Sequence, residues 1–295
     1  MAGVDERAAA PVSDEQGSVA DLTGALSAER TGEDTFGADS PDWWGGDRVF
    51  GGMVVAQALS AALQTVDPAM PVHSLHGYFL RPARPGRPVH LNVGHVRDGR
   101  SFALRDVTST VEGKETFKMM CSFHLEEDGE QYQLPMPEGV GDPDALEPSE
   151  TPIPFHVREL GPTQQRPDGS YQSTRRVWLR TKVDLPDDPA VHACVVAYLS
   201  DMTGAAFRPL SLGTWGTHTD ASLDHAVWFH RPVRADEWLL YDLCAVVNAG
   251  GRATVRGSMY TQDGLLRVSM AQELLIRLLD DPSPEIWPAW SATKL

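Results

Sequence analysis

The chain contains two long stretches in which an almost entirely apolar segment is followed by segments that alternate apolar and polar residues. The first apolar segment, 53–65, is rich in Ala and apolar on nearly all faces, which is typical of a buried helix. Four alternating segments then follow, at 72–80, 89–96, 102–111 and 116–125. Asp-Gly and Gly turns separate several of them and favour hairpins. The pattern predicts one buried helix and four antiparallel strands.

The second half repeats this order. A strand-like segment at 175–183 precedes an apolar helix at 192–207, and four alternating segments follow, at 222–229, 238–247, 253–261 and 265–276. Three pairs of landmarks, Arg81 with Arg231, Gly99 with Gly251 and Gly113 with Gly264, are separated by 150 to 152 residues. A repeat of that length indicates a duplicated domain rather than a solenoid. We predict an α+β protein with a tandem (double) hotdog fold, in which two antiparallel sheets each wrap around a central helix.

Local composition sets the expected domain boundaries. The first residues are Ala, Pro, Ser and acids, which bury too little apolar surface to order themselves. A later stretch is acidic, rich in Pro and Gly, and without periodicity, as in a linker. The predicted organisation is a disordered tail at 1–17, an N-terminal hotdog at 18–125, a linker at 126–150 and a C-terminal hotdog at 151–295.

Charge and cysteine content exclude several classes of protein. The formal net charge of −16 argues against a nucleic-acid partner, because phosphate binding needs clustered Lys and Arg. No apolar run approaches the ~20 residues of a membrane span, and no apolar secretory signal is recognisable at the start of the chain. Three cysteines lie far apart in apolar surroundings without a C-x-x-C motif, which favours reduced thiols in a cytoplasm.

The two repeats differ in buried polarity. On the last strand of the second repeat, period 2 places Gln272 among apolar core residues, and the repeat offset puts Cys121 at the matching position of the first. The second apolar helix also contains Asp201, whereas the first contains no acid. Buried carboxylates and amides are costly unless they are hydrogen-bonded. A structural network between Asp201 and Gln272 is one interpretation, and we favour a functional site confined to the second repeat.

Two further positions gave weaker signals. Period 2 does not place Ser222 in the core, because the face with Val227 and Phe229 is more apolar, unless Ser222 precedes the regular part of its strand. Gly51 and Gly52, before the first apolar helix, permit close backbone approach by a ligand or simply a tight turn. From the residues alone, Ser222 is better interpreted as an ordinary serine at the start of a strand, whereas the question of the two glycines stays open.

Taken together, the motifs resemble those of the acyl-CoA thioesterase II (TesB-like) enzymes, which are double hotdogs. The resemblance covers about residues 36–276 and rests on V-F-G-G (49–52), V-H-S-L-H-G-Y-F-L-R-P (72–82), R-D-G-R-S-F (97–102), Y-L-S-D (198–201), L-D-H-A-V-W-F-H-R-P (223–232) and Q-E (272–273). It implies a catalytic set of Asp201, Ser222 and Gln272, and substrate contacts from Phe50, Gly51, Gly52 and Met53. The family often has Gln at the position of Met53.

The resemblance also implies the reaction, hydrolysis of an acyl-CoA thioester by a water that Asp201, Ser222 and Gln272 hold and polarise. No cofactor or metal is expected, and there is no G-x-S-x-G nucleophile motif. Two alternatives are a hotdog hydratase, suggested by the spacing of Asp220 and His225, and a non-catalytic acyl-CoA-binding module. We expect a cytoplasmic homodimer or higher homo-oligomer, since exposed sheet edges favour association.

Overall fold

A computed structural model describes residues 17–41, 47–149, 153–160, 174–203 and 218–278. The predicted tail at 1–17 therefore lies almost wholly outside the described residues. The helices are α1 (Gly17–Leu26), α2 (Gly51–Leu63), the short 3₁₀ helix η1 (Pro143–Ala145) and α3 (Pro189–Ser200). The strands are β1 (Glu29–Arg30), β2 (Thr35–Ala38), β3 (Val72–Phe79), β4 (Val89–Asp98), β5 (Phe102–Val111), β6 (Lys114–His124), β7 (Phe155–Glu159), β8 (Thr174–Thr181), β9 (His218–Ser222), β10 (Asp224–Phe229), β11 (Leu239–Ala249), β12 (Arg252–Thr261) and β13 (Leu266–Leu278).

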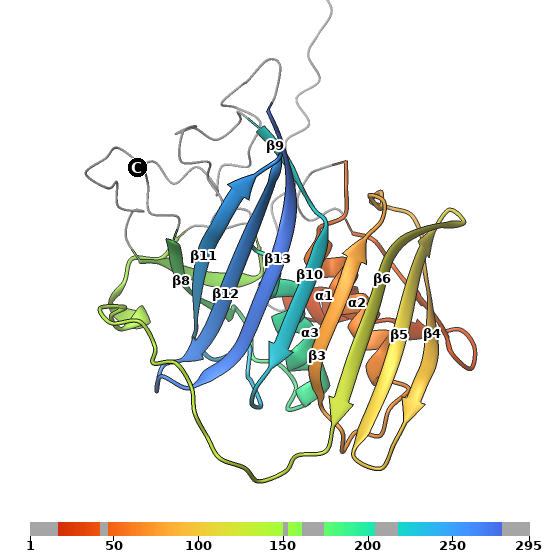
Figure 1. Cartoon of the computed structure of the whole chain (residues 1–295), viewed down its shortest axis with the longest axis horizontal. Coiled ribbons are helices and arrows are strands. Elements are labelled where there is room, and N and C mark those ends of the chain that lie inside the picture. The colour runs from red at the N-terminus through yellow and green to blue at the C-terminus, as the bar shows by residue number, and fades with distance from the viewer. Residues whose placement is uncertain (1–16, 42–46, 150–152, 161–173, 204–217, 279–295) are drawn as a thin grey trace, which may run out of the picture.

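The strands of both repeats belong to one antiparallel sheet rather than to the two separate sheets that we expected. Its order is β1-β2-β4-β5-β6-β3-β10-β13-β12-β11-β8-β7, with β9 paired to β13 (Figure 1). The repeats join where β3 and β10 pair, in a register that places Ser74 opposite Trp228. Each of these strands would otherwise be an exposed edge, and their backbone groups now bond to each other.

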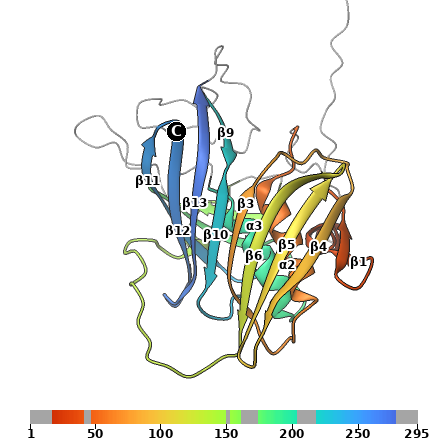
Figure 2. The same ribbon diagram turned by 45° about the vertical axis from the view of Figure 1, so that its right-hand side comes forward.

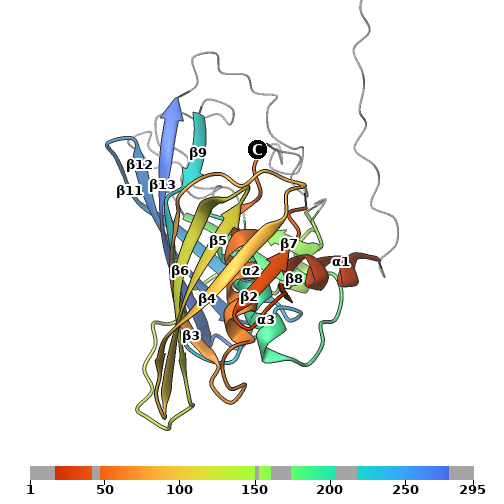
Figure 3. The ribbon, with the colours of Figure 1, turned by 90° about the vertical axis from the view of Figure 1, so that its right-hand side faces the viewer.

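Two apolar helices, α2 and α3, fill the inner face of the curved sheet (Figures 2 and 3). Nearly every residue of α2 from Gly52 to Ala62 is buried, in agreement with its almost entirely apolar sequence. The helix α3 begins with Pro189 and is capped by Asp188, whose side chain accepts a hydrogen bond from the Ala190 N–H. The start of α2 lies directly against the end of α3. The contact is so close that a Cβ on Gly52 would collide with the Tyr198 carbonyl.

The second helix is displaced from its predicted range of 192–207. It spans Pro189–Ser200, and Asp201 is its C-cap residue rather than a residue within it. The apolar residues that follow concealed this end, and 204–217 lie outside the described residues. The first helix begins two residues earlier than predicted, at Gly51, and the short strands β1, β2 and β7 were not predicted.

The connection between the repeats packs against the outer face of the second repeat instead of spanning freely. Within the predicted linker, Val140 is buried with Trp178 and Trp238, and its carbonyl accepts a hydrogen bond from Trp178 Nε1 at 3.2 Å. Trp238 Nε1 donates to Asp144 Oδ1 at 3.0 Å. No helix among the described residues is long and apolar enough to cross a membrane.

Candidate active site

The carboxyl group of Asp201 lies at the end of α3 and is almost completely buried, with 6% of the residue exposed. Burial raises its pKa to about 7, although hydrogen bonds from Gln272, the Gly52 backbone and Ser222 favour the ionised form. A carboxyl group with that pKa exchanges protons readily near neutral pH. This property suits a general base.

The side chain of Gln272 joins Asp201 to the sheet. As period 2 predicted, it points inward from β13 between buried Met270 and Leu274. Its Nε2 donates to Asp201 Oδ1 at 2.5 Å and to Ser222 Oγ at 2.7 Å. The two hydrogens of the amide nitrogen therefore both serve this cluster.

The structure brings Ser222 into the same cluster and explains why simple alternation did not place it there. The predicted strand 222–229 is broken at Leu223 into β9 and β10, and the pairing of β13 shifts by one residue between them. The side chain of Asp224 accepts the N–H of Glu273 at 2.7 Å at this irregularity. Ser222 thereby faces inward, and its Oγ donates to Asp201 Oδ1 at 3.3 Å.

The first repeat contributes the N-terminus of α2 to this corner. A Cβ at Gly51 would lie 2.6 Å from Asp201 Oδ2, so only glycine permits this approach. Gly52 meets the Tyr198 carbonyl and makes a backbone hydrogen bond to Asp201. The two glycines thus allow the end of the second repeat's helix to approach the start of α2 closely.

The flanking candidates of the substrate-binding segment have different environments. Phe50 is partly buried, with its ring edge-on to Tyr198 at a centroid distance of 5.0 Å. Met53 is 2% exposed and belongs to the core. Phe50 is therefore the more accessible of the two.

The hydratase alternative rested on the spacing of Asp220 and His225, and burial shifts the pKa values of these two residues in opposite directions. His225 is completely buried, its Nε2 contacts Ser200 Oγ at 2.7 Å, and burial lowers its pKa to about 3. Burial also raises the pKa of Asp220 to about 6, against an opposing effect of Arg48. Within the described ranges, no group of three or more His, Cys, Asp or Glu side chains is arranged to hold a metal ion.

Thr203 is a member of the cluster that sequence reasoning missed. Its Oγ1 donates to Gln272 Oε1 at 2.6 Å, and the residue is 1% exposed. The available signal was its position two residues after Asp201, which becomes meaningful only once the helix is known to end at Ser200.

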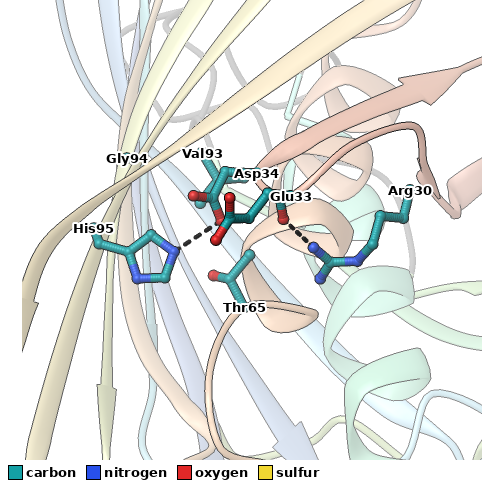
Figure 4. A pocket seen from close by; sticks show the side chains of 7 residues that line it. All are labelled: Arg30, Glu33, Asp34, Thr65, Val93, Gly94 and His95. Carbon is teal, nitrogen blue, oxygen red and sulfur yellow. Dashed lines mark hydrogen bonds and ion pairs between the residues drawn. The ribbon is translucent and has the colours of Figure 1, made fainter.

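A polar depression lies on the first repeat, where Thr65 follows the end of α2 (Figure 4). His95 Nε2 contacts Asp34 Oδ1 at 2.9 Å there, and Arg30 is bonded to the Glu33 carbonyl. The imidazole of His95 is thus paired with a carboxylate, and the guanidinium of Arg30 is bonded to a backbone carbonyl at the surface. The depression lacks the buried acid, hydroxyl and amide that meet at Asp201.

Comparison with solved structures identifies the class of fold. A protein of unknown function with a hot dog fold from Alicyclobacillus acidocaldarius superposes with a TM-score of 0.75 over 88% of this chain and 98% of that one, at 19% identity. An acyl-CoA thioesterase II, TesB2 from Mycobacterium marinum, reaches a TM-score of 0.78 at 36% identity, over 88% of this chain and 99% of that one. The chain therefore has a hotdog fold.

Sequence comparison then gives the family. Residues 40–124 match the model of the acyl-CoA thioesterase N-terminal domain, and residues 151–274 match the acyl-CoA thioesterase model. Human acyl-coenzyme A thioesterase 8 is 34% identical over 288 residues, covering 87% of this chain and 89% of its own length. The chain belongs to the acyl-CoA thioesterase family. It is an enzyme that hydrolyses the thioester of acyl-CoA, as the sequence motifs implied.

Proposed function

We propose that Asp201, Ser222 and Gln272 activate the water that hydrolyses a fatty acyl-CoA to a free fatty acid and CoA. The observation that carries this proposal is the sharing of one carboxylate oxygen, Asp201 Oδ1, by the hydroxyl of Ser222 and the amide of Gln272. Both bonds fix the carboxylate and leave Oδ2 beside the N-terminus of α2. Oriented groups of this kind lower the entropic part of a barrier.

In the proposed step, Asp201 takes a proton from the water as the water oxygen bonds to the thioester carbonyl carbon. The carbonyl oxygen becomes an oxyanion, and the positive end of the α2 dipole stabilises it. When the oxyanion collapses, the carbon–sulfur bond breaks, and the CoA sulfur leaves with the proton that Asp201 returns. The products are the carboxylic acid and the CoA thiol, so no covalent enzyme intermediate is needed.

The tandem arrangement of two hotdogs is part of the proposal. One repeat would supply the helix N-terminus and the other would supply Asp201, Ser222 and Gln272. Phe50, Gly51 and Gly52 would line the path by which the acyl thioester enters. Met53 would support this segment from the core. We further infer a role in lipid metabolism, a cytoplasmic location and a homodimer or higher homo-oligomer, which remain predictions.

The decisive variant is Asp201→Asn, which keeps the size of the side chain and removes the base. We expect an unchanged fold by circular dichroism and a loss of kcat of at least ~100-fold in a thiol-release assay with acyl-CoA. Free thiol and free acid should appear in equal amounts from the wild-type enzyme, whereas a hydratase would add water to crotonyl-CoA without releasing thiol. Full hydrolysis by the Asn variant would overturn the assignment of the base.

A further inference from the structure

Thr203 and Asp201 contact opposite ends of the same carboxamide. Asp201 Oδ1 accepts from Gln272 Nε2 at 2.5 Å, and Thr203 Oγ1 donates to Gln272 Oε1 at 2.6 Å. Both residues come from the turn that ends α3, where the Thr203 N–H donates to the Asp201 carbonyl at 2.7 Å. One short turn therefore fixes the acid and, from the other end, the amide that bonds to the acid.

Gln272 can donate hydrogen bonds to Asp201 and Ser222 only when the nitrogen of its carboxamide faces them. The terminal torsion of a glutamine side chain is broad and roughly two-fold, so rotamer preference alone does not orient the amide. With Nε2 toward Asp201, two N–H donors face two acceptors, on Asp201 and Ser222. After a half-turn, Oε1 would face the ionised carboxylate, and two acceptors would oppose each other.

The opposite end of the amide needs a donor for this orientation to be fully bonded. Gln272 is 1% exposed, so bulk water does not reach it freely, and a buried amide oxygen without a donor is unfavourable. Thr203 is equally buried and supplies that donor, and the buried imidazole of His225 also interacts with the Gln272 side chain. Its hydroxyl points at the end of Gln272 that faces away from Asp201.

We propose that Thr203 is a positioning residue for thioester hydrolysis, which holds the Gln272 carboxamide with its nitrogen toward Asp201 and Ser222. This inference rests on the proposed roles of those three residues. Thr203 acts through Gln272 and not on the substrate. Without its hydroxyl, the carboxamide rotates, and Asp201 loses a hydrogen bond that favours its ionised form.

The test compares Thr203→Val, which keeps the shape and removes the hydroxyl, with Thr203→Ser, which keeps the hydroxyl. For the Val variant we expect kcat to fall about tenfold with KM changed less than about twofold, a loss typical of a mispositioned polar group. The acid limb of its pH–kcat profile should move to higher pH, because the hydrogen bond from Gln272 lowers the pKa of Asp201. Thr203→Ser should restore kcat to within about threefold of wild type.

A matched control removes a buried threonine hydroxyl in the first repeat. Thr116 is 4% exposed, and its Oγ1 lies 3.2 Å from Ser109 Oγ. Thr116→Val should leave kcat and the pH profile unchanged. If Thr203→Val does not fold, as judged by circular dichroism, Thr203→Ala takes its place with the same expectations.

A double-mutant cycle with Gln272→Ala decides whether Thr203 acts through the amide. We expect Thr203→Val to cause no further loss of kcat once Gln272 is absent. A wild-type kcat and pH profile in Thr203→Val, or the same tenfold loss in the Gln272→Ala background, would overturn the positioning role. Failure of the underlying site has a different signature, since Asp201→Asn and Gln272→Ala would then themselves retain activity.

Discussion

The same corner of the fold occurs once in each repeat, and the two corners hold different residues. The C-cap residue of α3 is Asp201, whereas the C-cap residue of α2 is Gln64. Strand pairing makes Cys121 the counterpart of Gln272, and Val72 the counterpart of Ser222. An acid, a hydroxyl and an amide in the second repeat thus correspond to an amide, a valine and a thiol in the first.

A buried arginine occupies the first corner. Arg105 is paired with Cys121 and is 2% exposed, while the residue paired with Gln272 is the apolar Val255. The guanidinium donates to Thr65, to Asp98 and to the carbonyls of Arg97 and Leu104. Burial raises the pKa of the Cys121 thiol to about 12, so it stays protonated.

The comparison separates structural polarity from catalytic polarity. Arg105 is a buried charge whose donors are satisfied by neighbouring acceptors, which is how folds tolerate such a group. Asp201 also has partners, yet burial still raises its pKa far above the ordinary value. A carboxyl group whose pKa lies near 7 can both accept and release a proton at neutral pH, which is a property expected of a catalytic group.

Among the variants that compare the two corners, the largest difference in kcat is expected between Gln272→Ala and Cys121→Ala, at the matched positions on the sheet. Gln272→Ala removes two hydrogen bonds to the acid and its hydroxyl partner, and we expect kcat to fall about 100-fold. Cys121→Ala removes a buried thiol outside the active corner, so kcat should change less than about twofold. Thiol release under saturating acyl-CoA measures both, and equal losses would mean that the two corners do not differ in function.

The next effect is on stability and concerns Arg105. Arg105→Met keeps an apolar stem but leaves the acceptors around Thr65 without their donor, which should cost about 2 kcal/mol. Urea unfolding should show this loss, while kcat of the folded enzyme at 25 °C should stay within about twofold of wild type. A tenfold fall in kcat without a shift of the unfolding midpoint would instead tie Arg105 to catalysis.

A smaller effect is expected at the hydroxyl position. Ser222→Ala should lower kcat about tenfold, because Asp201 and Gln272 still contact each other directly. Ser222→Thr keeps the hydroxyl and should retain most of the activity. Val72→Ala, at the matching position of the first repeat, serves as the control and should affect only the unfolding midpoint. A Ser222→Ala enzyme with wild-type kcat would remove the serine from the proposed set.

The sequence predicted the elements that obey a regular period and missed those set by local irregularities. The inward orientation of Gln272 was predicted correctly because the pairing of β13 with β12 is regular across that position, so the alternation of the strand holds. Ser222 was not assigned from its pattern, because an irregular pairing at Leu223 changes which face the serine occupies. No alternation rule registers one extra residue in a strand.

The end of α3 and the pairing between the two repeats could likewise not be predicted from the local sequence pattern. The apolar residues after Asp201 extended the apparent helix, although the backbone leaves the helix at Asp201, and Thr203 could not be recognised as a partner of Gln272. The joining of the repeats through β3 and β10 depends on pairing between residues about 150 positions apart in the chain. Such pairing depends on tertiary packing rather than on either strand's own sequence.

The smallest expected effect tests the comparison through the pH dependence of stability, using one acid from each corner. Burial raises the pKa of Asp201 from 3.8 to about 7, so the native state binds more protons than the unfolded state between these values. Stability contributed by this group therefore falls as the pH rises through that window. Asp201→Asn cannot ionise, and its melting temperature should exceed that of wild type at pH 8 by about 3 °C, with a smaller difference at pH 5.

Asp98 should respond with the opposite sign. Its hydrogen bond from Arg105 lowers the pKa of Asp98 below 3.8, so this acid contributes stability above its unfolded pKa and loses it only when the pH falls through its folded pKa. Asp98→Asn should therefore melt slightly below wild type at pH 8, and the difference should disappear in acid. Calorimetry of both variants across this range compares the corners directly. The same sign in both variants would mean that the carboxylate of Asp201 is held for stability, as that of Asp98 is, and not for proton transfer.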